Sequence, residues 1–156
     1  DRAAGRRRPE IGPAQATVGC LPYPVRREDG EQVQRVRAVL VKPNGIIGTA
    51  DGSTLYVADI GDDKTYRYEV QADGSLESKT LFAPMGSDGM TLDEQGNVYL
   101  TGDGVTIFNR DGKKISHIDV PEKWTANITF GGKERRTLFI TASKSIYTLE
   151  MQVAGQ

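Results

Sequence analysis

Residues 43–59, PNGIIGTADGSTLYVAD, contain a pattern that recurs twice further along the chain. A small polar residue opens the segment, an alternating apolar run follows, and a Gly-containing turn leads to a second run centred on an aromatic residue. The same order is found in residues 87–102, SDGMTLDEQGNVYLTG, and in residues 126–142, ANITFGGKERRTLFITA. Alternation of apolar and polar residues is typical of half-buried β-strands. The repeat therefore predicts three copies of one strand–turn–strand unit.

A second repeated unit lies between these copies. Asp-Gly pairs at Asp29-Gly30, Asp73-Gly74 and Asp111-Gly112 each join two further alternating runs. Asp-Gly favours a tight hairpin turn, because such turns need residues with positive φ. Together the two units give four strands in about 40 residues, which is the size of one β-propeller blade.

We therefore predict an all-β fold made of four-stranded antiparallel propeller blades in residues 25–151. Residues 1–24 are expected to be irregular or disordered, and residues 152–156 to form a short tail. Strands are expected at 46–50, 54–59, 65–70, 76–82, 89–93, 97–101, 105–109, 113–120, 127–130, 137–141 and 145–151, with two strands of an earlier blade at 25–28 and 32–40.

The overall composition excludes several classes of protein. The 156 residues carry 20 Lys and Arg against 21 Asp and Glu, so the formal net charge is −1, which argues against a nucleic-acid partner. A single cysteine, Cys20, cannot form an internal disulfide. No apolar run approaches the roughly 18 residues of a membrane helix. We expect a soluble protein without a membrane partner, and both the cytoplasm and the periplasm remain open as its compartment.

Three polar residues occupy one equivalent position of the repeat. In a propeller the innermost strand of each blade begins at one mouth of the central channel, and Asn44, Asp88 and Asn127 stand at that point. All three offer side-chain oxygen, which suits a hard cation such as Ca²⁺ or Mg²⁺ better than a structural zinc site. The alternative is that Asn44-Gly45 and Asp88-Gly89 are simply turns.

The repeat also resembles a known family. The resemblance is carried by Pro43-Asn44-Gly45-Ile46, Leu55-Tyr56-Val57-Ala58-Asp59, Asp88-Gly89-Met90, Gly96-Asn97-Val98-Tyr99, Phe130-Gly131-Gly132 and Thr137-Leu138-Phe139-Ile140-Thr141-Ala142. These motifs look like the C-terminal half of the gluconolactonase/regucalcin family, also called senescence-marker-protein-like. The resemblance covers residues 32–151. It implies a six-bladed propeller, of which about three blades are present here, with a divalent metal in the channel.

The resemblance also implies roles for individual residues. Asn44 and Asp88 would be metal ligands, and Asp88 would also be the catalytic general base, while Asn127 would line the channel. The family's other Glu and Asn ligands have no counterpart in this sequence. Ca²⁺ is the first choice of metal, with Zn²⁺ or Mg²⁺ as alternatives. The implied reaction is the opening of a sugar lactone or related ester by a metal-activated water.

Two alternatives remain beside this interpretation. In the first the chain is a non-catalytic propeller-type binding module, and in the second it is an inactive fragment of such an enzyme. About half a ring leaves open blade edges, so we expect either a portion of a longer chain or self-association of two copies.

Other residues are interpreted more simply. We expect no catalytic role for Cys20 or His117, turns at Gly131-Gly132 and Asp62-Asp63, and packing roles for Trp124 and Met90 near a blade junction, although either could line a substrate pocket.

Overall fold

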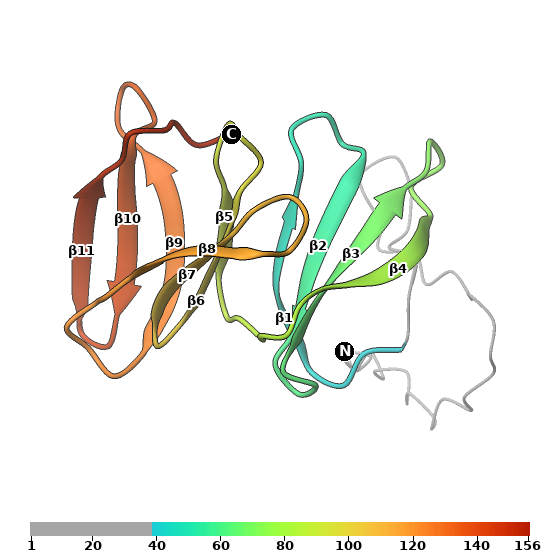
Figure 1. The fold of residues 1–156 in the computed structure, drawn as a ribbon, viewed down its shortest axis with the longest axis horizontal. Coiled ribbons are helices and arrows are strands. Elements are labelled where there is room, and N and C mark those ends of the chain that lie inside the picture. The colour runs from blue at the N-terminus through green and yellow to red at the C-terminus, as the bar shows by residue number, and fades with distance from the viewer. Residues whose placement is uncertain (1–38) are drawn as a thin grey trace, which may run out of the picture. The chain divides into compact units, whose positions relative to one another are not determined.

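Strands that pair with their neighbours in the chain make up the fold. The computed structural model describes residues 39–156, and within this range there are eleven strands and no helix (Figure 1). They are β1 (Pro43–Gly48), β2 (Thr54–Asp59), β3 (Lys64–Val70), β4 (Leu76–Ala83), β5 (Met90–Leu92), β6 (Val98–Gly102), β7 (Gly104–Phe108), β8 (Lys114–Ile118), β9 (Thr125–Gly131), β10 (Thr137–Ala142) and β11 (Ser145–Glu150). Each of the eleven strands predicted beyond residue 40 is confirmed, with ends that shift by a few residues. This part of the chain has no helix long and apolar enough to cross a bilayer.

Several predictions lie outside the described residues. These are the irregular segment 1–24, Cys20, the strand at 25–28, the Asp29-Gly30 turn, and the strand at 32–40 except for its last two residues. Those two residues, Val39 and Leu40, belong to no strand.

The strands form three antiparallel sheets that follow the order of the chain. The first sheet is β1-β2-β3-β4, the second is β5-β6-β7-β8, and the third is β9-β10-β11. Contacts of β1 with β5, and of β5 and β6 with β9, join the consecutive sheets. Figure 1 shows the three sheets one after another, the first teal to green, the second yellow-green to ochre and the third orange to dark red. Two sheets have the four strands of the predicted blade, and the third has the expected three.

Glycines close the predicted hairpins. Gly74 and Gly112 have φ of 81° and 79°, and each donates its N–H to the carbonyl three residues earlier, at 2.9 Å from Gln71 O and Asn109 O. A side chain is disfavoured in this left-handed conformation, which is why Asp-Gly predicts such turns. The hairpin predictions at these two sites are confirmed.

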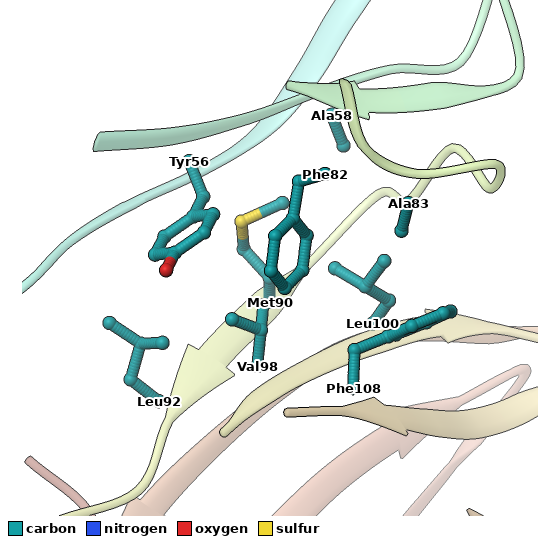
Figure 2. Packing of buried hydrophobic residues seen from close by; sticks show 9 residues of the cluster. All are labelled: Tyr56, Ala58, Phe82, Ala83, Met90, Leu92, Val98, Leu100 and Phe108. Atoms are coloured by element: carbon teal, nitrogen blue, oxygen red, sulfur yellow. The ribbon is translucent and has the colours of Figure 1, made fainter. Parts of the chain in front are cut away.

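An apolar core joins the first and second sheets (Figure 2). Its members are Tyr56, Ala58, Phe82, Ala83, Met90, Leu92, Val98, Leu100 and Phe108. The Phe82 ring packs edge-on against Tyr56 and Phe108, with centroids 4.7 and 6.1 Å apart. Met90 is buried in this core, which confirms its predicted packing role.

A second core joins the second and third sheets. It contains Tyr99, Val105, Ile107, Ile128, Leu138 and Ile140. Every residue of β6 and β7 is buried, because the second sheet is covered on both faces. In β10, by contrast, buried and exposed residues alternate. Phe139 and Ile146 are 37% and 73% exposed, so the third sheet has one open outer face.

The last residues of the chain lie against the second and third sheets. Gln156 donates its backbone N–H to Leu92 O at 3.1 Å, Gly155 donates to Arg135 O at 2.8 Å, and Ala154 O accepts from Glu94 N–H at 2.8 Å. The segment expected to be a tail is thus hydrogen-bonded to the end of β5 and to the turn after β9.

A buried carboxylate fixes the point where β1 begins. Asp59, at the end of β2, is 1% exposed. It accepts backbone N–H groups from Val41 at 2.6 Å, Lys42 at 2.7 Å and Gly61 at 3.2 Å. Burial alone raises the pKa of Asp59, but the hydrogen bonds from Lys42, Val41 and Gly61 outweigh it and hold the pKa below the ordinary 3.8. Asp59 therefore holds the chain just before Asn44.

Asp59→Asn is expected to lower the free energy of unfolding by roughly 1–3 kcal/mol at neutral pH, because the amide keeps only one acceptor oxygen and at least one backbone N–H loses its partner. A carboxyl whose pKa is lower in the folded state than in the unfolded state stabilises the folded protein at pH values above the unfolded pKa. This stabilisation is lost as the pH falls through the folded pKa. The difference between wild type and variant should therefore be constant above pH 3.8 and shrink below it. Urea unfolding at pH values above and below 3.8 measures this difference in the free energy of unfolding, and Asp103→Asn, at an exposed aspartate, is the control. A difference that does not change with pH would contradict this role.

Candidate active site

The inner strands of the three sheets are irregular at the end where the candidate residues lie. The β1–β2 ladder is interrupted between Pro43 and Ile46. The β9–β10 ladder is interrupted between Thr125 and Asn127. Asp88 lies in the bend just before β5. Such interruptions turn side chains out of the regular alternation, and they are frequent beside active sites.

Asn44 and Asp88 meet at this end. The Asn44 Nδ2 group donates a hydrogen bond of 2.7 Å to Asp88 Oδ1, across two inner strands that belong to different sheets. Asp88 is half-buried and Asn44 is exposed. Two of the three residues that share one position of the sequence repeat are therefore in direct contact.

Asn127 lies next to this pair without a hydrogen bond to either member. Its Oδ1 accepts the backbone N–H of Ile128 at 2.8 Å, and its Cα lies 2.7 Å from the point where a Cβ on Gly89 would stand. Asn127 thus contacts the residue that follows Asp88. Its role as a channel-lining residue remains a prediction.

The two glycines of these motifs allow the inner strands to approach one another. Neither Gly45 nor Gly89 has a positive φ, and Gly45 lies within β1. A Cβ on Gly45 would stand 3.0 Å from Ser87 O, and one on Gly89 would stand 2.7 Å from Asn127 Cα. Asn44-Gly45 is therefore not a turn, since both residues lie in β1, whereas Asp88 lies in the bend before β5. Both glycines allow close approach between sheets.

A hydroxyl network clamps the backbone on both sides of Asp88. Ser87 Oγ accepts the Thr101 N–H at 2.8 Å and donates to Gly89 O at 2.5 Å. Thr101 Oγ1 accepts the Gly89 N–H at 3.0 Å. Both hydroxyl residues are buried. Neither residue was predicted as functional, although a threonine that follows the apolar run Val98-Tyr99-Leu100 is a detectable signal in the sequence.

Trp124 also contacts Asp88, which the sequence did not predict. Its indole Nε1 donates a hydrogen bond of 3.0 Å to Asp88 Oδ2. The side chain is 49% exposed and lies outside both apolar cores. The expected packing role of Trp124 is therefore wrong, and both carboxylate oxygens of Asp88 have a hydrogen-bond donor.

The donors at this end fit part of a site for a hard cation. Within residues 39–156, no three His, Cys, Asp or Glu side chains are close enough to hold a metal ion. The oxygens of Asp88, Asn44 and Asn127 are of the kind that Ca²⁺ and Mg²⁺ prefer, but Ca²⁺ takes six to eight of them. These residues would supply some of the ligands, and water or other parts of the protein the rest.

The remaining candidates lie elsewhere. His117 is on β8, the outermost strand of the second sheet, with its Nδ1 3.1 Å from Thr106 Oγ1. Gly132 forms the turn after β9, with a φ of 81°. Asp62 lies in the turn before β3, where it accepts a hydrogen bond from Lys64 Nζ at 2.8 Å. The turns predicted after β9 and before β3 are confirmed, and His117 lies in the strand predicted at 113–120.

Comparison with known proteins identifies several that this chain resembles in sequence and fold. The 6-deoxy-6-sulfogluconolactonase of Pseudomonas putida is 31% identical over 129 residues, which are 76% of this chain and 44% of that protein. A gluconolactonase structure from Xanthomonas campestris has a TM-score of 0.70 and 32% identity, over 80% of this chain and 42% of that one. A structure from Agrobacterium tumefaciens, described as a calcium-binding protein, regucalcin, has a TM-score of 0.71 and 24% identity, over 81% of this chain and 51% of that one.

These comparisons confirm the predicted fold and family. The chain is a partial β-propeller, since the solved structures that match it are propellers of this kind. It spans less than half the length of the relative from P. putida. The SMP-30/gluconolactonase/LRE-like region matches residues 13–144, and the chain belongs to this family.

Proposed function

We propose that this chain forms part of the active site of a gluconolactonase-type hydrolase, which opens a sugar lactone or related ester with the help of a divalent cation. The observation that carries the proposal is the contact between Asn44 and Asp88, which joins two inner strands at 2.7 Å. The named activities of the relatives from P. putida and X. campestris support the same reaction class.

Asp88 would act as ligand and general base. A bound cation would polarise the lactone carbonyl and lower the pKa of a ligated water. Asp88 would orient the attacking water and accept its proton as the water oxygen bonds to the carbonyl carbon. The ring C–O bond would then break, and the leaving oxygen would take up the proton held by Asp88, which restores the carboxylate and gives the open-chain hydroxy acid.

Asn44 and Asn127 would complete this chain's share of the site. Asn44 offers an amide oxygen as ligand and an N–H that holds Asp88 Oδ1. Asn127 would line the channel beside Gly89. Ca²⁺ is the proposed metal, because all three donors are oxygens and a structural neighbour is described as calcium-binding. Zn²⁺ and Mg²⁺ are the alternatives to be compared.

Cation binding tests this proposal. The chain is freed of metal with a chelator, and its melting temperature is then measured with increasing CaCl₂, MgCl₂ or ZnCl₂. Binding to the folded state should add about 2.7 kcal/mol of stability at 100 times the dissociation constant. The rate of glucono-1,5-lactone hydrolysis above the spontaneous rate should rise with the same midpoint. No thermal shift with any of the three cations would contradict the proposal, and NaCl at equal ionic strength is the control.

The open face of the third sheet favours a second candidate. Phe139 and Ile146 are exposed there, so a further blade or a second copy of the chain would bury apolar surface on this face. Under this alternative the chain is a binding module or an inactive fragment. Saturable cation binding without any hydrolysis would favour it, and sedimentation measures the self-association.

A further inference from the structure

Trp124 occupies a position that a packing residue does not take. It is the residue before β9, half of its side chain is exposed, and its Nε1 lies 3.0 Å from Asp88 Oδ2. Met90, which was expected to have the same role, is buried in the first core. A large aromatic ring that is left exposed beside a carboxylate offers an apolar face and a polar edge at the same point.

The loop that carries Trp124 is anchored on both sides. Val120 packs against the second core, and Glu122 Oε1 accepts the hydroxyl of Tyr147 at 3.2 Å. Thr125, which follows Trp124, is fully buried. The indole is therefore presented by ordered neighbours rather than by a loose segment, which is what a binding surface needs.

We infer that Trp124 belongs to the Asp88 site in two ways: its N–H positions the carboxylate, and its exposed ring face receives the C–H face of a ring-shaped sugar ligand. This inference rests on the proposed lactone hydrolysis. The C–H face of a sugar ring is its least polar surface, and an aromatic face beside a few fixed polar groups is the usual way to hold such a surface.

Stacking on Trp124 would discriminate between substrate and product. A lactone has a closed ring with a flat apolar face, whereas the hydroxy acid formed by hydrolysis is an open chain without one. Stacking on Trp124 therefore favours the substrate. A factor of about ten in affinity is expected between ring and open-chain compounds, which is the scale of one aromatic contact.

The single tryptophan of the chain makes the binding directly observable. Because Trp124 is the sole Trp, tryptophan emission reports on this ring alone. The probes are 1,5-anhydro-D-glucitol, a sugar ring without a carbonyl to hydrolyse, and D-glucitol, its open-chain counterpart. The ring compound should change the emission saturably, and D-glucitol should need about ten times the concentration. No change with the ring compound, or equal affinity for both, would overturn the inference.

Two substitutions separate the two parts of the role. Trp124→Phe keeps a ring but loses the N–H, so kcat for the lactone should fall about tenfold with little change in KM. Trp124→Leu loses the ring as well, so KM should also rise about tenfold. Phe139→Leu, at an exposed aromatic on the open face of the third sheet, is the matched control and should change neither.

The outcomes distinguish this inference from the proposed function. If hydrolysis depends on Asp88 but both Trp124 variants match wild type, the inference fails and the function stands. If the chain hydrolyses no lactone but its emission still prefers the ring compound, the function fails and the sugar-binding role of Trp124 stands.

Discussion

Gly89→Ala is expected to lower the free energy of unfolding by about 3 kcal/mol, because the added Cβ overlaps the neighbouring inner strand. That Cβ would stand 2.7 Å from Asn127 Cα and would also meet Asn127 Oδ1. The Oδ1 end can move, but the Cα belongs to the backbone of β9 and cannot move without disturbing the ladder with β10. Urea unfolding followed by circular dichroism at neutral pH measures the change.

A glycine within β1 provides the control. Gly48, in β1, would place a Cβ 3.7 Å from Thr54 O, which is ordinary van der Waals contact. Gly48→Ala should therefore change the free energy of unfolding by less than about 1 kcal/mol, with stabilisation as the expected direction. Equal destabilisation by the two variants would show that loss of glycine itself, and not close approach between sheets, is responsible. A Gly89 variant as stable as wild type would contradict the packing seen here.

The strands could be predicted because their signals are local. Alternation over five to eight residues decides where a half-buried strand lies. The Asp73-Gly74 and Asp111-Gly112 pairs mark the hairpins by a conformation that the dipeptide itself favours. Repetition then places Asn44 and Asp88 at one point of successive blades. Their proximity therefore follows from the periodicity of the sequence together with the propeller arrangement, whereas the hydrogen bond between them was not predicted.

The contacts that were missed are formed between residues far apart in the chain. Trp124 is 36 residues from Asp88, and no period of the repeat connects the two. Asp88-Gly89 has the sequence of a turn, but a glycine is required at position 89 because β9, a strand of another sheet, lies too close for a side chain. Asp59 likewise binds the backbone 17 and 18 residues before it. Such requirements depend on the packing of one sheet against another or on tertiary hydrogen bonds, which local patterns do not encode.

Asp88→Asn is expected to slow hydrolysis of glucono-1,5-lactone roughly 1,000-fold, because an amide has almost the same shape but cannot accept the proton of the attacking water. The lost negative charge should also weaken Ca²⁺ binding by at least about tenfold. Asn44 Nδ2 and Trp124 Nε1 both donate to this side chain, and an amide oxygen can still accept one of them. The variant should therefore remain folded, with a loss of unfolding free energy no larger than about 1.5 kcal/mol.

The rate and the calcium affinity must be measured on the same preparation, since only their joint loss assigns both roles to Asp88. Asp103→Asn is the matched control, because Asp103 is an exposed aspartate, and it should keep wild-type hydrolysis and calcium binding. A variant at Asp88 that retains full lactonase activity would refute its catalytic role, even with a lowered calcium affinity. A variant that binds Ca²⁺ as wild type does but no longer hydrolyses the lactone would leave Asp88 as general base and move the ligand role to other residues.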